Sequence, residues 1–132
     1  MDKLKEKQIV TEIKDRNVFF SLLKQNPGLI IIKLGATWCG PCKMIKKDVD
    51  HFFLSSPPDV ICCDLDIDEC FDLYSMLQSK RMVNGVPALL CYKQGNHSFA
   101  PDYSVTGADR TALHQFFTKC SASIKNNNLV VK

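Results

Sequence analysis

One hydrophobic run constrains the fold of this chain more than any other feature. Residues 29–34 read Leu-Ile-Ile-Ile-Lys-Leu, with a single polar side chain among six. A strand that is apolar on both faces must be covered on both faces, as the central strands of α/β proteins are. The run therefore predicts a buried central strand in a sheet that has helices on each side.

Strands and helices are expected to alternate along the rest of the chain. Further strands are expected at residues 8–13, 60–67, 86–92 and 99–105, the last interrupted near Pro101. Helices are expected after Asp15, from Gly40, at residues 69–78 and after Asp109, with the aspartates as N-caps. The helix from Gly40 is expected to have an apolar side formed by Met44, Ile45, Val49, Phe52 and Phe53. This order predicts an α/β fold whose mixed sheet ends in a hairpin.

Length and charge limit the classes of protein to which this chain can belong. Its 132 residues suit one domain, expected over residues 1–124, with a polar tail at 125–132 whose asparagines end the last helix. A formal net charge of +3 is too small to indicate a nucleic-acid-binding protein. The apolar runs fall far short of the ~18 residues of a membrane span, and the charged residues 1–7 lack the apolar segment of a signal peptide. We therefore expect a cytoplasmic monomer that binds neither nucleic acid nor membrane.

The cysteines give the strongest chemical signal. Seven cysteines cannot all pair within one chain, and in a reducing compartment structural disulfides are rare. Two of them lie in Trp38-Cys39-Gly40-Pro41-Cys42, directly after the buried strand and at the start of a helix. Unpaired N–H groups at a helix start favour a thiolate, so Cys39 is the candidate nucleophile. Cys42, one turn further in, is expected to be less exposed and to act as the resolving thiol.

Such a pair can exchange with a disulfide of a partner protein. Cys39 would attack that disulfide, and Cys42 would then attack Cys39, release the reduced partner and leave a Cys39–Cys42 disulfide. Two other interpretations stay open, namely inert cysteines and a zinc site. Zinc needs four ligands, and no second pair has matching spacing, since Cys62 and Cys63 are adjacent. We therefore expect no metal, and no cofactor besides the redox-active disulfide.

On these residues the chain resembles the thioredoxin family over about residues 8–120. The resemblance rests on the motif at 38–45, the acidic segment 64–68, Gly85-Val86-Pro87, the turn at 93–95 and Gly107 before the last helix, in that order. It implies the thioredoxin fold, with a central mixed five-stranded sheet flanked by four helices. It also implies a thiol–disulfide oxidoreductase that reduces protein disulfides, because Gly-Pro between the cysteines resembles the reducing branch of the family.

The resemblance implies roles for residues around the cysteines. Pro87 matches the family's cis-proline, which packs beside the two cysteines, and Val86 would offer its backbone to an extended substrate segment. The expected substrate-binding surface is completed by Trp38, Gly40, Pro41 and Gly107. The expected reductant is a thioredoxin reductase, which would hold the flavin and use NADPH, because this chain has no Gly-rich dinucleotide motif.

One position departs from the family's pattern. The family usually has a buried aspartate six residues before the first cysteine, and often a lysine on the next strand. Here these positions hold Lys33 and Asp64. A lone ammonium is expensive to bury, so we expect the two to form a charge-swapped, semi-buried pair that handles the proton of Cys42, with either residue as its acceptor. The alternative is that Lys33 extends to the sheet edge while Asp64 faces water.

The cysteines outside the motif are expected to be small core residues, in particular Cys62, Cys63 and Cys91. Cys70, at a helix start, is expected to be a partly buried thiol, with an exposed cysteine that links two chains as the alternative. The alternative function for the whole chain is a binding or accessory subunit of the same fold with incidental redox activity. An oxidising or isomerising enzyme is a third, and a markedly higher reduction potential would indicate it.

Overall fold

The computed structural model describes residues 7–131 and contains a mixed sheet of five strands. The strands are β1 (Ile9–Val10), β2 (Leu29–Gly35), β3 (Val60–Asp66), β4 (Ala88–Lys93) and β5 (Tyr103–Thr106). They lie in the order β1-β3-β2-β4-β5, so β2 is central. β3 pairs in parallel with β1 and β2, whereas β4 pairs antiparallel with β2 and β5. The predicted α/β class and mixed five-stranded sheet are confirmed.

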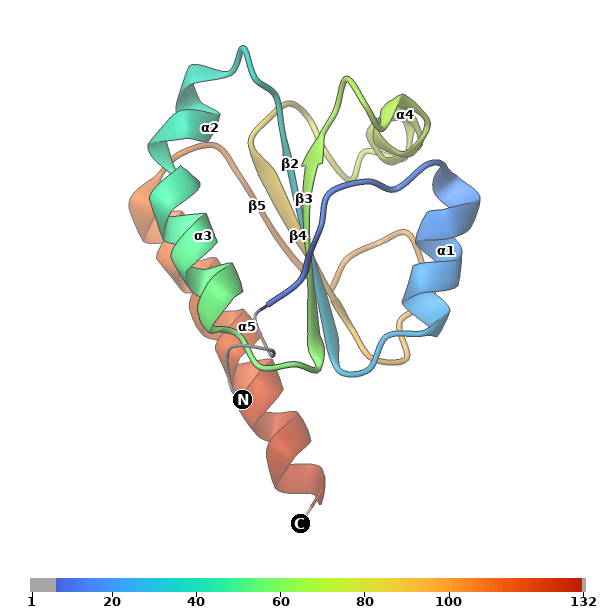
Figure 1. The fold of residues 1–132 in the computed structure, drawn as a ribbon, viewed down its shortest axis with the longest axis vertical. Coiled ribbons are helices and arrows are strands. Elements are labelled where there is room, and N and C mark those ends of the chain that lie inside the picture. Colours follow the sequence, from blue (N-terminus) through green and yellow to red (C-terminus); the bar gives the residue numbers. More distant parts are fainter. Residues whose placement is uncertain (1–6, 132) are drawn as a thin grey trace.

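Helices cover both faces of this sheet. They are α1 (Arg16–Lys24), α2 (Gly40–Met44), α3 (Lys46–Ser55), α4 (Phe71–Ser79) and α5 (Arg110–Val131). Figure 1 shows α1 and α4 on one side of the sheet and α2, α3 and α5 on the other. None of the helices described is both long and apolar enough to cross a membrane.

The central strand is buried along its whole length, as its composition predicts. Side chains along a strand alternate between the two faces. Ile30, Ile32 and Leu34 pack into the core beneath α1 and α4. Leu29 and Ile31 pack into the core beneath α3 and α5. Lys33 continues this second series, which places a lysine on the face that α3 and α5 cover.

Both predicted aspartate caps are present. Asp15 Oδ1 accepts a hydrogen bond from the N–H of Val18 at 3.0 Å, and Asp109 Oδ1 accepts one from the N–H of Thr111 at 3.0 Å. Each carboxylate satisfies an N–H group that has no partner inside its helix. The strand expected at residues 99–105 is shorter than expected, because β5 begins only at Tyr103, after Pro101; it is an edge strand, where a nearby proline is tolerated.

Three local predictions are wrong. The sheet is flanked by five helices rather than four, because the backbone at Ile45 (φ −100°, ψ 0°) separates α2 from α3. Met44 was expected on the apolar side, yet it is 73% exposed, because the single turn of α2 lies at the end of the sheet (Figure 1). The last helix continues past the asparagines to Val131, since asparagine lowers helix propensity without preventing helix formation. The domain boundary expected at residue 124 stays a prediction.

Asn26 joins the end of α1 to the far end of β4 and provides a test of this packing. It is 5% exposed, its Nδ2 donates to the Tyr92 carbonyl at 3.0 Å, and its Oδ1 accepts from the Gly28 N–H at 2.9 Å. Asn26→Ala removes both hydrogen bonds from buried backbone groups, so we expect the free energy of unfolding to fall by about 1–3 kcal/mol. Urea denaturation measures this, with exposed Gln25→Ala as the control. An unchanged stability in Asn26→Ala would contradict the assigned role.

Candidate active site

The two cysteines of the motif form a disulfide at the point where the central strand gives way to α2. Cys39 is the N-cap of α2 and Cys42 lies in its single turn, with 5.3 Å between their Cα atoms. Pro41 occupies the first turn, where a missing N–H leaves no helical hydrogen bond unmade. The pairing of Cys39 with Cys42 is therefore present in the structure.

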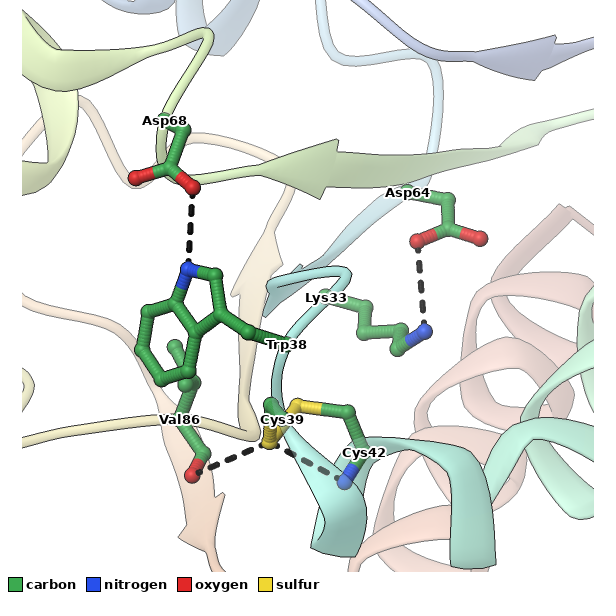
Figure 2. The surroundings of a disulfide bond; sticks show 7 residues. All are labelled: Lys33, Trp38, Cys39, Cys42, Asp64, Asp68 and Val86. Carbon is green, nitrogen blue, oxygen red and sulfur yellow. Dashed lines mark hydrogen bonds and ion pairs between the residues drawn. A yellow bond between two sulfur atoms is a disulfide. The ribbon is translucent and has the colours of Figure 1, made fainter.

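Two polar backbone groups approach the Cys39 sulfur. The N–H of Cys42 donates to Cys39 Sγ at 3.1 Å, and the carbonyl oxygen of Val86 lies 3.8 Å from the same atom (Figure 2). α2 has only five residues, so the nearby N–H rather than a long helix dipole acts on this sulfur. In the reduced protein such a donor stabilises a thiolate at Cys39.

The expected difference in exposure between the two cysteines is absent. Cys39 is 4% exposed and Cys42 is 5% exposed. The prediction that Cys42 is the less exposed is wrong for this disulfide form, because the bond ties Cys39 to Cys42, the buried residue of α2, while the carbonyl of Val86 approaches Cys39. What distinguishes Cys39 is its N-cap position and the N–H that points at its sulfur. The neighbouring Trp38, Gly40 and Pro41 are exposed.

Trp38 is the large apolar side chain beside the disulfide. It is 66% exposed, and its Nε1 donates to Asp68 Oδ2 at 3.0 Å (Figure 2). This bond holds the indole over the segment that follows β3. Sequence reasoning missed Asp68 as a site residue. The acidic segment that contains it was visible, but its partner lies 30 residues away in the chain.

Of the residues that the resemblance implies near the cysteines, Val86 approaches Cys39, and Pro87 and Gly107 are linked to Val86 in turn. The peptide bond between Val86 and Pro87 is cis, and Pro87 is buried at the start of β4. The N–H of Gly107 donates to the Pro87 carbonyl at 2.8 Å. Gly107 has φ +93°, a left-handed conformation that glycine adopts without steric cost. The turn before α5 is thereby connected to the proline that follows Val86.

Lys33 and Asp64 form the expected charge-swapped pair. They are register partners on β2 and β3, and Lys33 Nζ lies 3.4 Å from Asp64 Oδ1 (Figure 2). The Lys33 side chain is 9% exposed and that of Asp64 is 33% exposed. The alternative, in which Lys33 extends to the sheet edge, is therefore wrong.

A surface pocket of about 300 Å³ connects this pair with Cys42. It is lined by Lys33, Gly35, Ala36, Thr37, Cys42, Lys43, Lys46, Asp64, Leu65 and Asp66. The pocket therefore approaches Cys42 from beside β2 and β3, whereas Val86 and Trp38 adjoin Cys39. Across residues 7–131, no three or more His, Cys, Asp or Glu side chains are arranged to hold a metal ion.

The other cysteines are buried thiols. Cys62, Cys63 and Cys91 are core residues, as expected, and so is Cys120. Cys70 is 2% exposed, which overturns the alternative of an exposed cysteine that links two chains. Burial, helped by the nearby charges of Asp66 and Glu69, raises the pKa of the Cys70 thiol to about 11. Burial likewise raises the pKa of Cys63 to about 12.

Comparisons of the sequence with known proteins agree with this geometry. The family model described as Thioredoxin matches residues 9–119. Thioredoxin-2 of Saccharomyces cerevisiae is 33% identical over 107 residues, which cover 81% of this chain and 94% of that protein. The thioredoxin of Homo sapiens is 33% identical over 88 residues, which cover 66% of this chain and 79% of that protein.

Solved structures show the same arrangement of elements. A thioredoxin from Nicotiana alata superposes with a TM-score of 0.63 at 28% identity, covering 86% of this chain and 93% of that one. The thioredoxin of Trichomonas vaginalis gives a TM-score of 0.66 at 23% identity, covering 84% and 96%. The second likeness concerns the fold alone.

Selective alkylation tests whether Cys39 ionises more readily than the cysteines outside the motif, since all of them are buried. At pH 7 a thiol with a pKa of about 11 is roughly one ten-thousandth ionised, so Cys70 should react very slowly. We expect iodoacetamide to modify Cys39 of the reduced, folded protein at least about tenfold faster than Cys70 or Cys63. Peptide mass spectrometry measures each site, and unfolding the protein should abolish the difference. Equal rates in the folded protein would contradict the assignment.

Proposed function

Because this chain belongs to the thioredoxin family and is a thiol–disulfide oxidoreductase, we propose a specific role for each residue of its active site. Cys39 is the nucleophile and Cys42 the resolving thiol. The single observation that carries this assignment is the N–H of Cys42 directed at Cys39 Sγ, 3.1 Å away. A donor in that position stabilises negative charge on Cys39, and the thiolate is the attacking species.

The proposed reaction has two exchange steps. The Cys39 thiolate attacks one sulfur of a protein disulfide, forms a mixed disulfide and displaces the other sulfur as a thiolate. Cys42 then loses its proton and attacks Cys39 Sγ, which forms the Cys39–Cys42 disulfide and releases the second sulfur of the partner. The two protons that the dithiol loses are regained, through solvent, by the two thiols of the partner. The charges of Lys33 and Asp64 govern how readily Cys42 loses its proton.

The substrate is proposed to lie across the surface around Cys39. The backbone of Val86, whose carbonyl lies 3.8 Å from Cys39 Sγ, pairs with an extended substrate segment. Trp38 offers an exposed apolar face, and the other contacts come from Gly40, Pro41, Pro87 and Gly107. This arrangement favours unfolded or loop disulfides, because their backbone is free to adopt an extended conformation.

The proposed reductant is a thioredoxin reductase, which holds the flavin and draws on NADPH. The proposed compartment is the cytoplasm, where the buried thiols of Cys62, Cys63, Cys70, Cys91 and Cys120 stay reduced. The protein is proposed to act as a monomer, since both exchange steps use cysteines of one chain.

Reduction of insulin by dithiothreitol tests the proposal against the alternative of a binding subunit. The wild-type protein should accelerate insulin reduction, Cys39→Ser should abolish the acceleration, and Cys42→Ser should accumulate a mixed disulfide at Cys39. Cys70→Ser is the matched control and should retain activity, because Cys70 is buried outside the disulfide. Wild-type protein that does not accelerate the reaction would favour the binding subunit.

The reduction potential distinguishes a reductant from an oxidising or isomerising enzyme. We expect a reduction potential of about −270 mV, as in reducing thioredoxins. An isomerase would have about −180 mV and an oxidant about −120 mV. Equilibration of the Cys39–Cys42 pair with glutathione buffers measures it. A value above about −200 mV would contradict the reducing role.

A further inference from the structure

A buried cation lies on the side of the resolving cysteine that faces away from the substrate surface. Lys33 occupies the α3 and α5 side of β2, near the strand end that leads into the disulfide. Its side chain is only 9% exposed, so little solvent screens its charge. The proposed reaction needs a thiolate at Cys42, and burial of this side chain by itself disfavours a thiolate.

Gly35 shows how near this cation is to the Cys42 sulfur. A Cβ placed on Gly35 would lie 3.5 Å from Cys42 Sγ and 3.6 Å from Lys33 Cε. The distance from Lys33 Cε to Cys42 Sγ therefore cannot exceed the sum of these two distances, and the ammonium nitrogen is one bond beyond Cε. Figure 2 shows the Lys33 side chain between the Asp64 carboxylate and Cys42. Lys33 and Cys42 also line the same pocket.

Asp64 opposes this charge only in part. Its carboxylate lies 3.4 Å from Lys33 Nζ on the neighbouring strand, and its side chain is 33% exposed. Water therefore screens the carboxylate more strongly than the ammonium. Of the two opposing charges, that of Lys33 is the less screened, which favours a positive net field at Cys42.

The other charged groups around the pocket are more exposed or already engaged. Lys46 is 64% exposed and its Nζ lies 2.6 Å from Asp50 Oδ2. Lys43, on α2, is exposed. Asp66, at the end of β3, accepts a hydrogen bond from the N–H of Asp68 at 2.9 Å. Lys33 is the buried cation among the residues that line the pocket.

We propose that Lys33 is a positioning residue that stays protonated and stabilises the Cys42 thiolate, with Asp64 as its anchoring counter-ion. This inference rests on the proposed roles of Cys39 and Cys42. When Cys42 ionises, its proton passes to water in the pocket, and the Cys42 thiolate attacks Cys39 Sγ of the mixed disulfide. The Cys39–partner bond breaks, and the departing partner thiolate takes a proton from solvent. Lys33 exchanges no proton in this sequence.

The test follows the resolving step against pH in the full chain. The reduced protein reacts with one equivalent of the aromatic disulfide dithiobis(nitrobenzoate). One thionitrobenzoate ion is released when Cys39 attacks this disulfide, and the second is released only when Cys42 attacks Cys39. Lys33→Met removes the cation, so the midpoint of the rate profile should rise by about one pH unit. Asp64→Asn removes the opposing charge, so the midpoint should fall. A purely structural ion pair would not shift the two midpoints in opposite directions.

Three further variants separate charge from folding. Lys33→Arg keeps the charge and should leave the midpoint near that of the wild type. The double variant Lys33→Asp, Asp64→Lys retains an ion pair but reverses its polarity, so its midpoint should rise above the wild-type value. Lys46→Met removes an exposed lysine of the same pocket and should leave the midpoint unchanged.

The outcomes also separate this inference from the proposed function. Failure of the wild-type protein to release the second thionitrobenzoate ion would contradict the resolving role of Cys42. Normal release with an unshifted midpoint in Lys33→Met and in the double variant would overturn only the role of Lys33. If Asp64→Asn instead slows the resolving step at every pH without lowering the midpoint, Asp64 is the proton acceptor. That result would likewise overturn the proposed role of Lys33.

Discussion

The hydrogen bond from the N–H of Cys42 to the sulfur of Cys39 depends on an abrupt change of backbone conformation. The chain leaves a fully buried strand and enters a helix within a few residues, so the first helical N–H groups have no carbonyl partners. A cysteine at the N-cap supplies the acceptor that serine or aspartate supplies elsewhere, such as Asp15 at α1. One hydrogen bond therefore both satisfies an N–H group at the helix start and stabilises a thiolate at Cys39.

The core on each face of the sheet holds the junction between β2 and α2 in place. β2 contributes apolar side chains to both layers, and the cis Val86–Pro87 segment reaches the disulfide because β4 pairs with β2. The layer beneath α3 and α5 is apolar at Leu29 and Ile31 but carries the Lys33–Asp64 pair at the end nearest the disulfide. A buried ion pair seldom adds much net stability over apolar residues of similar size. Its position beside Cys42 gives it a chemical consequence that packing alone would not require.

How far sequence reasoning reaches depends on how local each interaction is. The caps at Asp15 and Asp109, the buried β2 and the redox motif follow from residues that are neighbours in the chain. The Lys33–Asp64 pair was also predictable, because an isolated ammonium in an apolar strand demands a partner. The hydrogen bond from Trp38 to Asp68, the break at Ile45 and the equal burial of Cys39 and Cys42 were not, since each depends on how separate elements meet.

The sequence by itself determined the layered α/β architecture and the identity of the reacting sulfurs, because hydrophobic periodicity and helix-start chemistry act over a few residues. Only the tertiary structure decided what surrounds those sulfurs. It brought Val86 to Cys39 from one direction and Lys33 toward Cys42 from another, while it covered Cys70. These distances arise from strand register and helix packing, and both are set by contacts between residues far apart in the chain.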